Sequence, residues 1–168
     1  MKIKIEIGNI INYEVDAVVN AANQQLMAGG GVCGTIFKAA GYDVLSKECR
    51  SIGYCPTGSA VITSGYNLKA KYIIHAVGPI YKDETSAKYL KSCYESILRI
   101  ACEFNLKTIA IPSISTGIYG YPKEQAAFIA YNTIKEYKTT NIEEVILVCF
   151  DKETFDIYGR LLWQKKLN

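Results

Sequence analysis

Short runs of Val, Ile and Ala recur along this chain, and each is followed by a segment with helical periodicity. Most of these runs are continuously apolar, as expected for strands of a sheet that helices cover on both faces. Strands that alternate with helices are typical of a layered α/β/α domain with a largely parallel central sheet. The predicted strands are Lys2–Ile7, Ala17–Asn20, Ser59–Ser64, Tyr72–Ala76, Thr108–Pro112 and Glu144–Phe150. The predicted helices are Gly34–Ala40, Tyr42–Ser51, Thr85–Phe104, Lys123–Tyr137 and Lys152–Gln164.

The length of 168 residues suits one domain, and no linker, repeat or low-complexity run divides the chain. We therefore expect residues 1–168 to form a single domain. No apolar run approaches the roughly 20 residues that a membrane-spanning helix needs. The first seven residues alternate apolar and charged side chains, which is typical of a strand rather than of a secretory signal. We expect a cytoplasmic protein with no membrane partner.

Six cysteines and a single histidine raise the question of a disulfide or a metal site. No C-x-x-C pair is present, and one histidine cannot complete a familiar ligand set. We expect reduced cysteines and no metal or other cofactor. The net charge of +3 comes from scattered Lys and Arg residues, which gives little support for nucleic-acid binding. No stripe of apolar residues is left over after the core is assigned, so we expect a monomer.

The loop after the second predicted strand is rich in glycine. Gly29, Gly30 and Gly31 lack Cβ atoms, so this backbone can adopt positive φ angles and approach a ligand closely. A helix is expected to begin just after them, so that free amide groups and a helix N-terminus face an anion. Asn20 and Asn23 supply uncharged donors and acceptors, suited to ribose hydroxyls or to holding the loop. The pattern predicts phosphate binding.

A second glycine-containing loop, Ser113–Pro122, also follows a predicted strand and precedes a predicted helix. Ser115, Thr116 and the amides of Gly117–Gly120 are potential donors to a diphosphate, and Tyr119 offers an aromatic face and a hydroxyl to a sugar. Each glycine loop alone is equally consistent with a simple turn. Two such loops at the same sheet edge favour a cleft for a diphosphate flanked by sugars. Neither matches the G-x-x-x-x-G-K-[ST] pattern, so nucleoside triphosphate chemistry is not expected.

These motifs resemble the macrodomain family, and specifically its MacroD-type branch, which removes ADP-ribose or O-acetyl groups. The resemblance covers nearly the whole chain. It implies a three-layer α/β/α sandwich around a mixed sheet, with ADP-ribose or an ADP-ribosylated protein as partner and a hydrolase or deacetylase activity. The motifs that carry it are Gly8–Ile10, Asn20–Asn23, Gly29–Ala40, Thr57–Gly58, Ala70–Pro79, Ile114–Pro122 and Val148–Asp151.

The resemblance also implies roles for individual residues. Asn9 stands where the family usually has an aspartate that accepts a hydrogen bond from the adenine amino group. The backbone amide of Ile10 would reach the same ring, and Phe150 would stack on it. Asn23 and Tyr119 would border the distal ribose, where the scissile bond lies. The diphosphate would be wrapped by Gly30, Gly31, Val32, Ser115, Thr116, Gly117, Ile118 and Tyr119.

Cys33 departs from the pattern, because the MacroD-type branch has an aspartate there that is implicated in activating water or orienting the substrate. A thiol is a poorer hydrogen-bond acceptor than a carboxylate and a weak base at neutral pH. One alternative makes Cys33 a nucleophile with His75 as its base. Another holds a water between Asn23 and a ligand phosphate that acts as base. Losing a general base costs about 10²–10⁴-fold in rate, so slow hydrolysis and a non-catalytic reader both remain open.

The remaining signals have simpler interpretations. The change from Asp to Asn at Asn9 is expected to weaken ligand binding without abolishing it, because hydrogen bonds to charged groups are about twice as strong as neutral ones. Asp151 is interpreted as the N-cap of the last helix, and His75 as a structural histidine with satisfied hydrogen bonds. A binder of another nucleotide sugar or of nucleic acid is the third functional alternative.

Overall fold

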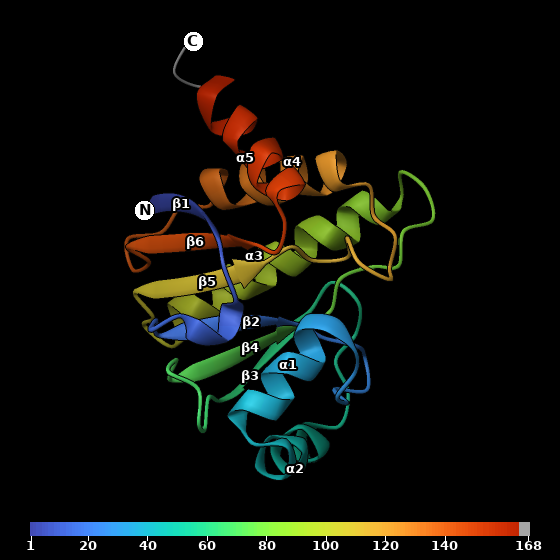
Figure 1. Ribbon diagram of the computed structural model, residues 1–168, viewed down its shortest axis with the longest axis vertical. Coiled ribbons are helices and arrows are strands. Elements are labelled where there is room, and N and C mark those ends of the chain that lie inside the picture. The colour runs from blue at the N-terminus through green and yellow to red at the C-terminus, as the bar shows by residue number, and fades with distance from the viewer. Residues whose placement is uncertain (165–168) are drawn as a thin grey trace.

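The computed structural model describes residues 1–164, in which five helices and a 3-10 turn surround a six-stranded sheet (Figure 1). The strand order is β1-β6-β5-β2-β4-β3. All neighbouring strands are parallel except β3, which runs antiparallel to β4 at one edge. The strands are β1 (Lys2–Ile7), β2 (Ala17–Ala21), β3 (Ala60–Ser64), β4 (Tyr72–Ala76), β5 (Thr108–Pro112) and β6 (Glu144–Cys149). The helices are η1 (Ile10–Asn12), α1 (Gly31–Ala40), α2 (Tyr42–Ile52), α3 (Ser86–Glu103), α4 (Lys123–Glu136) and α5 (Lys152–Gln164).

Helices cover both faces of the sheet, as the continuously apolar strands predict. Alternate residues of one strand enter different cores: Val145 and Leu147 of β6 pack in the core that includes α3, α4 and α5. Ile146 and Val148 of the same strand pack in the core that includes η1, α1 and α2. In Figure 1, α4 and α5 lie towards β6, whereas α1 and α2 lie towards β4 and β3. The architecture is therefore the three-layer sandwich with a mixed sheet that the resemblance implies.

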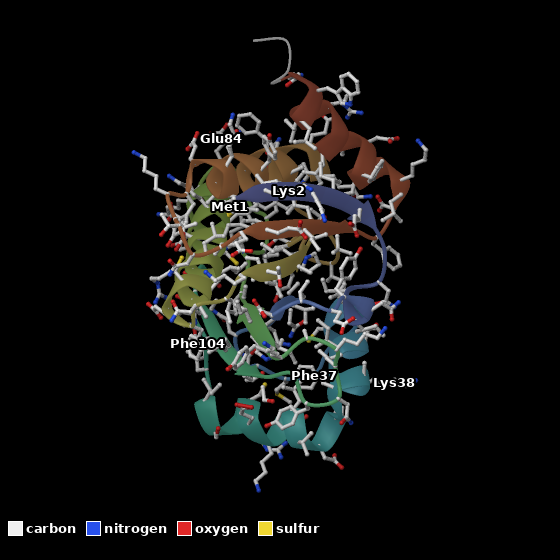
Figure 2. The ribbon with its side chains drawn as sticks, turned by 90° about the vertical axis from the view of Figure 1, so that its left-hand side faces the viewer. Met1, Lys2, Phe37, Lys38, Glu84 and Phe104 are labelled. Atoms are coloured by element: carbon white, nitrogen blue, oxygen red, sulfur yellow. The ribbon has the colours of Figure 1, made fainter. Side chains whose placement is uncertain are left out.

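One face of helix α1 packs in the core, and the opposite face is exposed to solvent. Phe37 is 1% exposed and packs in the core with Ile36 and Ala40, whereas its neighbour Lys38 is exposed. Figure 2 shows Phe37 among the interior side chains and Lys38 at the surface. The helix begins at Gly31, three residues earlier than predicted, so Gly31, Val32 and Cys33 belong to its first turn rather than to a loop. Glycine has low helix propensity, which explains why the sequence suggested a later start.

The other predicted bounds differ from the observed ones by one residue at most. One of these differences affects the candidate site: Phe150 was predicted to end β6 but lies just beyond it. Its side chain is 88% exposed. Among residues 1–164, no helix is long and apolar enough to cross a membrane.

The sheet opens between β2 and β5, the two strands that precede the glycine loops. Their pairing covers only Ala17 with Ile109 and Val18 with Ala110, whereas β2 continues beside β4 as far as Ala21. The chain leaves β2 for α1 on one face and leaves β5 for α4 on the other face. Ligands of open α/β sheets bind at such a switch point, outside the carboxyl ends of the strands. The topology thus places both glycine loops at one crevice.

Candidate functional site

Two connected cavities lie at the carboxyl ends of the parallel strands. The first, which we call the thiol cavity, has a volume of about 350 Å³, and its wall includes Asn23, Cys33 and Tyr119. The second, the phenyl cavity, has a volume of about 560 Å³ and is lined by Asn9, Phe150 and neighbouring residues. They form one elongated cleft, because the glycine loops contribute to both walls. The shared residues are Gly31, Val32, Ser113 and Gly117.

The first glycine loop delivers the N-terminus of α1 to the middle of this cleft. Gly30 is the N-cap residue and makes no side-chain capping hydrogen bond, so the amides of the first turn have no capping acceptor. Gly31 adopts a positive φ of 58°. A Cβ atom at Gly34 would overlap the carbonyl oxygen of Gly29, so only glycine allows the loop to pack against the helix here. The result is an uncapped helix N-terminus suited to an anion.

The second glycine loop faces this helix terminus and is held rigidly. Its ends are tied by hydrogen bonds from the Tyr121 amide to Ser115 O (2.9 Å) and from the Tyr81 amide to Tyr119 O (2.9 Å). Ser115 has a φ of 68°, which is strained for a residue with a side chain. Ile118, at the tip, is 96% exposed. A strained, pre-formed loop of this kind is typical of a ligand-binding site.

Ser115 also carries one of two buried side-chain oxygens that have no hydrogen-bond partner within residues 1–164; the other is Asn20 Oδ1. The Ser115 side chain lies in the wall of the thiol cavity and the residue is 6% exposed. A buried hydroxyl without a partner costs about 1–3 kcal/mol. This cost is removed when a ligand oxygen in the cavity accepts its proton.

Gly78, which follows β4, fixes the position of the second loop, and sequence reasoning assigned it no role. A Cβ atom at Gly78 would overlap Ser115 Oγ and Ile114 Cγ2. We expect Gly78→Ala to lower the free energy of unfolding by about 1–3 kcal/mol, because the loop must move to relieve the overlap. Gly117→Ala is the matched control, since a Cβ there meets nothing within 4 Å. Urea denaturation of both variants checks this, and equal stabilities would contradict it.

Cys33 is buried in the wall of the thiol cavity and belongs to a network of hydrogen bonds. Its Sγ accepts from Asn20 Nδ2 at 3.6 Å. The same Nδ2 lies 3.1 Å from His75 Nδ1. His75 Nε2 lies 2.9 Å from Thr63 Oγ1, which itself donates to Ser64 O at 3.2 Å. The tautomer that satisfies all these contacts carries its proton on Nε2 and accepts from Asn20 at Nδ1.

These hydrogen bonds bear on two points that the sequence left open: the proposed Cys33–His75 pair and the role of Asn20. Asn20 lies between Cys33 and His75, so the geometry does not support a direct Cys33–His75 catalytic pair. Burial lowers the pKa of His75 to about 4, so the ring is neutral at physiological pH and acts as a structural residue. Asn20 was predicted to contact ribose hydroxyls or to hold the loop; it is fully buried and lies outside the cavity wall, which does not favour contact with a ligand. Its amide holds the residues beneath the site instead.

Asn23 uses half of its amide to hold the first loop. Its Nδ2 donates to Met27 O at 2.9 Å, and its Oδ1 accepts from the Met27 amide at 3.0 Å. Cys33 Sγ donates to the same Met27 carbonyl at 3.6 Å. A primary amide has two N–H groups and two lone pairs on oxygen. One donor and one acceptor of Asn23 therefore remain for a water or a ribose hydroxyl in the thiol cavity.

The phenyl cavity combines an exposed aromatic ring with polar groups. Phe150 borders it beside Asn9 and Ile10. Asp151 caps α5, because its Oδ1 accepts from the Thr154 amide at 2.8 Å; this confirms its predicted role, although the residue also lines the cavity. Asp151 Oδ2 is 3.0 Å from Lys123 Nζ. The hydrogen bond from the Thr154 amide, and after it the contact with Lys123, hold the pKa of Asp151 below its usual value.

The structure brings all the predicted site residues except Asn20 to the wall of this cleft. Charge is distributed unevenly: the thiol cavity has no Asp, Glu, His, Lys or Arg in its wall, and the phenyl cavity has the paired Lys123 and Asp151. Several further wall residues were not among the predicted catalytic or ligand-binding residues, although Gly29 and Ser113 lie in the predicted glycine loops and Asp151 was interpreted as a helix cap. They are Gly8, Ala21, Ala22, Gly29, Thr35, Gly78, Pro112, Ser113, Ile114, Lys123, Val148, Asp151 and Thr154.

A larger hollow of about 1100 Å³ lies at the opposite edge of the sheet. Its wall includes Met1, Tyr131 and Tyr137. Neither glycine loop contributes to it, and neither do the two unpartnered buried oxygens. The glycine loops and the unpartnered Ser115 hydroxyl lie at the carboxyl edge of the strands, whereas the larger hollow has Lys135 and Lys138 in its wall.

Comparisons with known proteins agree with this geometry. The Macro domain family model matches residues 19–130. A macro domain-containing protein of Listeria monocytogenes is 49% identical over 172 residues, which cover 96% of this chain and 97% of that protein. The Xenopus laevis protein named ADP-ribose glycohydrolase MACROD2 is 49% identical over 167 residues, covering 96% of this chain but 40% of the relative. The solved structure of an Oceanobacillus iheyensis macrodomain with ADP superimposes with a TM-score of 0.90 at 36% identity, covering 96% of this chain and 90% of that one.

Proposed function

The chain belongs to the macrodomain family, and on that premise we propose that it binds ADP-ribose in the cleft and slowly hydrolyses ADP-ribosyl esters there. The diphosphate occupies the glycine loops that the two cavities share. The adenosine lies in the phenyl cavity, and the distal ribose lies in the thiol cavity. The substrates are proteins ADP-ribosylated on acidic side chains, or O-acetyl-ADP-ribose.

The observation that carries the proposed binding is the unpartnered, buried hydroxyl of Ser115 beside the uncapped N-terminus of α1. Both features supply hydrogen-bond donors, and both favour an anion over a neutral group. The wall of the thiol cavity has no basic side chain, so the charge of a diphosphate is met by amides and hydroxyls. This arrangement suits a ligand that binds and leaves without transferring a phosphoryl group.

Ser115→Ala tests that assignment with opposite effects on stability and binding. Removing an unpartnered buried hydroxyl is expected to leave the melting temperature unchanged or higher. The same change removes a hydrogen bond to a charged phosphate, so the Kd for ADP-ribose is expected to rise about 10–100-fold.

Ser86→Ala is the matched control for this experiment. The Ser86 hydroxyl accepts from the Lys82 amide at 3.1 Å, and the residue lies outside the cleft. This variant is expected to lose stability and to keep its affinity for ADP-ribose. Calorimetric titration and thermal denaturation of both variants provide the data, and an unchanged Kd for Ser115→Ala would contradict the assignment.

The proposed hydrolysis uses the ligand as its own base, since the thiol cavity has no carboxylate or imidazole in its wall. A water held by the remaining donor of Asn23 attacks the anomeric carbon of the distal ribose. The bond from that carbon to the acceptor oxygen breaks, and its electron pair leaves with the acceptor. The water proton passes to a phosphate oxygen of the ligand, and the phosphate charge stabilises the developing oxocarbenium ion.

Cys33 favours a second candidate function, that of a reader that binds ADP-ribose without cleaving it. A protein mono-ADP-ribosylated on acidic residues separates the two, because hydrolysis releases free ADP-ribose and leaves a carboxylate. We expect release in proportion to enzyme concentration over hours, measured by mass spectrometry, and the same for O-acetyl-ADP-ribose. Binding without any release above the uncatalysed background would leave the reader function and exclude the hydrolase.

A further inference from the structure

Strand β1 lies at an edge of the sheet and, within residues 1–164, pairs only with β6. The Lys2 amide donates to Glu143 O at 2.8 Å, so the even-numbered residues of the strand point their amides and carbonyls towards β6. The amides and carbonyls of Ile3, Ile5 and Ile7 therefore point away from the sheet. Such a row of unpaired backbone groups can pair with a strand of another chain.

A groove of about 370 Å³ lies between this edge and α5. The strand contributes residues 3–6 to its wall, and the helix contributes Phe155, Gly159, Leu162 and Trp163. Their spacing places these four residues on one face of α5. Phe155 is 36% exposed and Trp163 is 69% exposed, and Figure 1 shows α5 projecting on the side of the sheet where β1 lies. The expectation of a monomer assumed that the core uses every apolar stripe, and this face of α5 is an exception.

Gly159 lies near the middle of this helical face, although glycine is a poor helix former. The fold of the single chain does not require it, because a Cβ atom at this position would meet nothing within 4 Å and its φ is not positive. The missing side chain leaves open space beside the groove. A glycine at such a point allows another backbone to approach closely.

The sequence of β1 is complementary to itself in one antiparallel register. When Ile5 faces Ile5 of a second copy, Ile3 faces Ile7, and the outward-pointing amides and carbonyls of the two strands meet as hydrogen-bonded pairs. In this register Lys4 faces Glu6 on both sides of the centre. Opposite charges in directly facing cross-strand pairs stabilise a sheet, and like charges destabilise it.

Charge also disfavours the neighbouring registers. A shift by two residues in either direction sets Lys4 against Lys4 or Glu6 against Glu6 of the second copy. In the single chain, Lys4 Nζ lies 2.9 Å from Glu144 Oε2, and one Glu6 oxygen accepts from Tyr13 Oη at 2.9 Å. An ammonium group has three donors and a carboxylate has two oxygens, so both side chains can add a cross-strand contact and keep these.

We propose that two copies of this chain associate through β1 as a twofold-symmetric dimer, in which the two six-stranded sheets become continuous and the two α5 helices meet at Gly159. A twofold axis perpendicular to the sheet at Ile5 keeps both α5 helices on the same face. It also covers Ile7, which is 54% exposed in the single chain. No residue of the groove wall belongs to either cavity of the cleft, so the dimer is independent of the proposed function.

Sedimentation velocity of the full chain, at concentrations from about 1 µM to 1 mM, tests the association. We expect a reversible dimer with a Kd of about 1–100 µM, as for a small interface. Hydrogen exchange of the backbone amides identifies the surface: those of Ile3, Ile5 and Ile7 are expected to exchange more slowly as the dimer forms. A monomer throughout this range would overturn the proposal, and so would a dimer in which these three amides exchange as fast as in the monomer.

Gly159→Gln tests the helix contact without a demand on the fold, because its side chain enters open space and glutamine is the better helix former. We expect an equal or higher melting temperature at concentrations where the protein is monomeric. The dimer Kd is expected to rise about tenfold or more, because the side chain keeps the two helices apart. Arg160→Gln is the matched control, on the same helix but outside the groove wall, and should leave the dimer Kd unchanged. Equal Kd values for the two variants would overturn the helix contact.

Exchange of the two charges tests the register. Lys4→Glu sets carboxylates against each other in a dimer of identical copies, and Glu6→Lys sets ammonium groups against each other, so each variant alone is expected to be monomeric. An equimolar mixture restores opposite charges at both facing pairs and is expected to form a heterodimer, detected by native mass spectrometry. Thermal melting shows that each variant is folded. Two folded variants that do not associate when mixed, or that dimerise equally well alone, would overturn the register.

Discussion

Replacing Cys33 by aspartate is expected to raise the rate of ADP-ribosyl ester hydrolysis by about 10²–10⁴-fold, the usual contribution of a positioned general base. Cys33 Sγ lies in the wall of a cavity that has no carboxylate, and accepts from Asn20 Nδ2 at 3.6 Å. A carboxylate at this position accepts the same hydrogen bond and can take a proton from water. It also lies in the first turn of α1, where negative charge is favourable.

The control for this gain is Cys33→Asn, which has nearly the shape of the aspartate but cannot act as a base. It should leave the rate near that of the unaltered protein, so that any acceleration by aspartate is assigned to the carboxylate. Initial rates of ADP-ribose release, with Kd values measured in parallel, separate chemistry from binding. Equal rates for the aspartate and asparagine variants would show that the thiol is not what limits turnover.

His75 is expected to make the protein less stable as the pH falls. Burial lowers the pKa of His75 from 6.5 to about 4, so the unfolded state binds a proton at a higher pH than the folded state does. The stability from the neutral buried ring is present above pH 6.5 and is lost as the pH falls towards 4. Linkage gives a loss of about 2 kcal/mol between pH 7 and 5, and of about 3 kcal/mol by pH 4.

Denaturant titrations at several pH values measure this loss, and His75→Gln isolates it from the carboxylates that titrate below pH 5. The glutamine variant is expected to be less stable at pH 7, because Asn20 and Thr63 lose their partner. Its free energy of unfolding should change much less between pH 7 and 5. Parallel pH profiles for the two proteins would contradict the assignment of a neutral, buried His75.

Much of the fold was predictable because the strands are short, apolar on both faces and separated by clear helical segments. The bounds of β1, β4, β5 and α5 match the prediction. The start of α1 was wrong, because a glycine run has low helix propensity and its helical state depends on packing rather than on local preference.

The candidate site was predictable where its chemistry lies in the backbone of a loop. Glycine runs after buried strands identify such loops without knowledge of side-chain contacts. Asn20 shows the limit of this reasoning, since an asparagine at a strand end has the same appearance whether it faces a ligand or the core. Only the pairing of β2 with β4, which sets Asn20 beside His75, shows that its amide is used internally. The close approach of Gly78 to the second loop likewise depends on tertiary geometry.

The cleft is expected to bind ADP-ribose through its glycine loops. Calorimetric titration of the unaltered protein with ADP-ribose tests this most directly, followed by competition with ADP. We expect one ADP-ribose to bind per chain, and ADP to displace it, because the base and diphosphate alone fill the phenyl cavity and the shared loops. No heat on titration with ADP-ribose, together with no competition by ADP, would contradict this expectation.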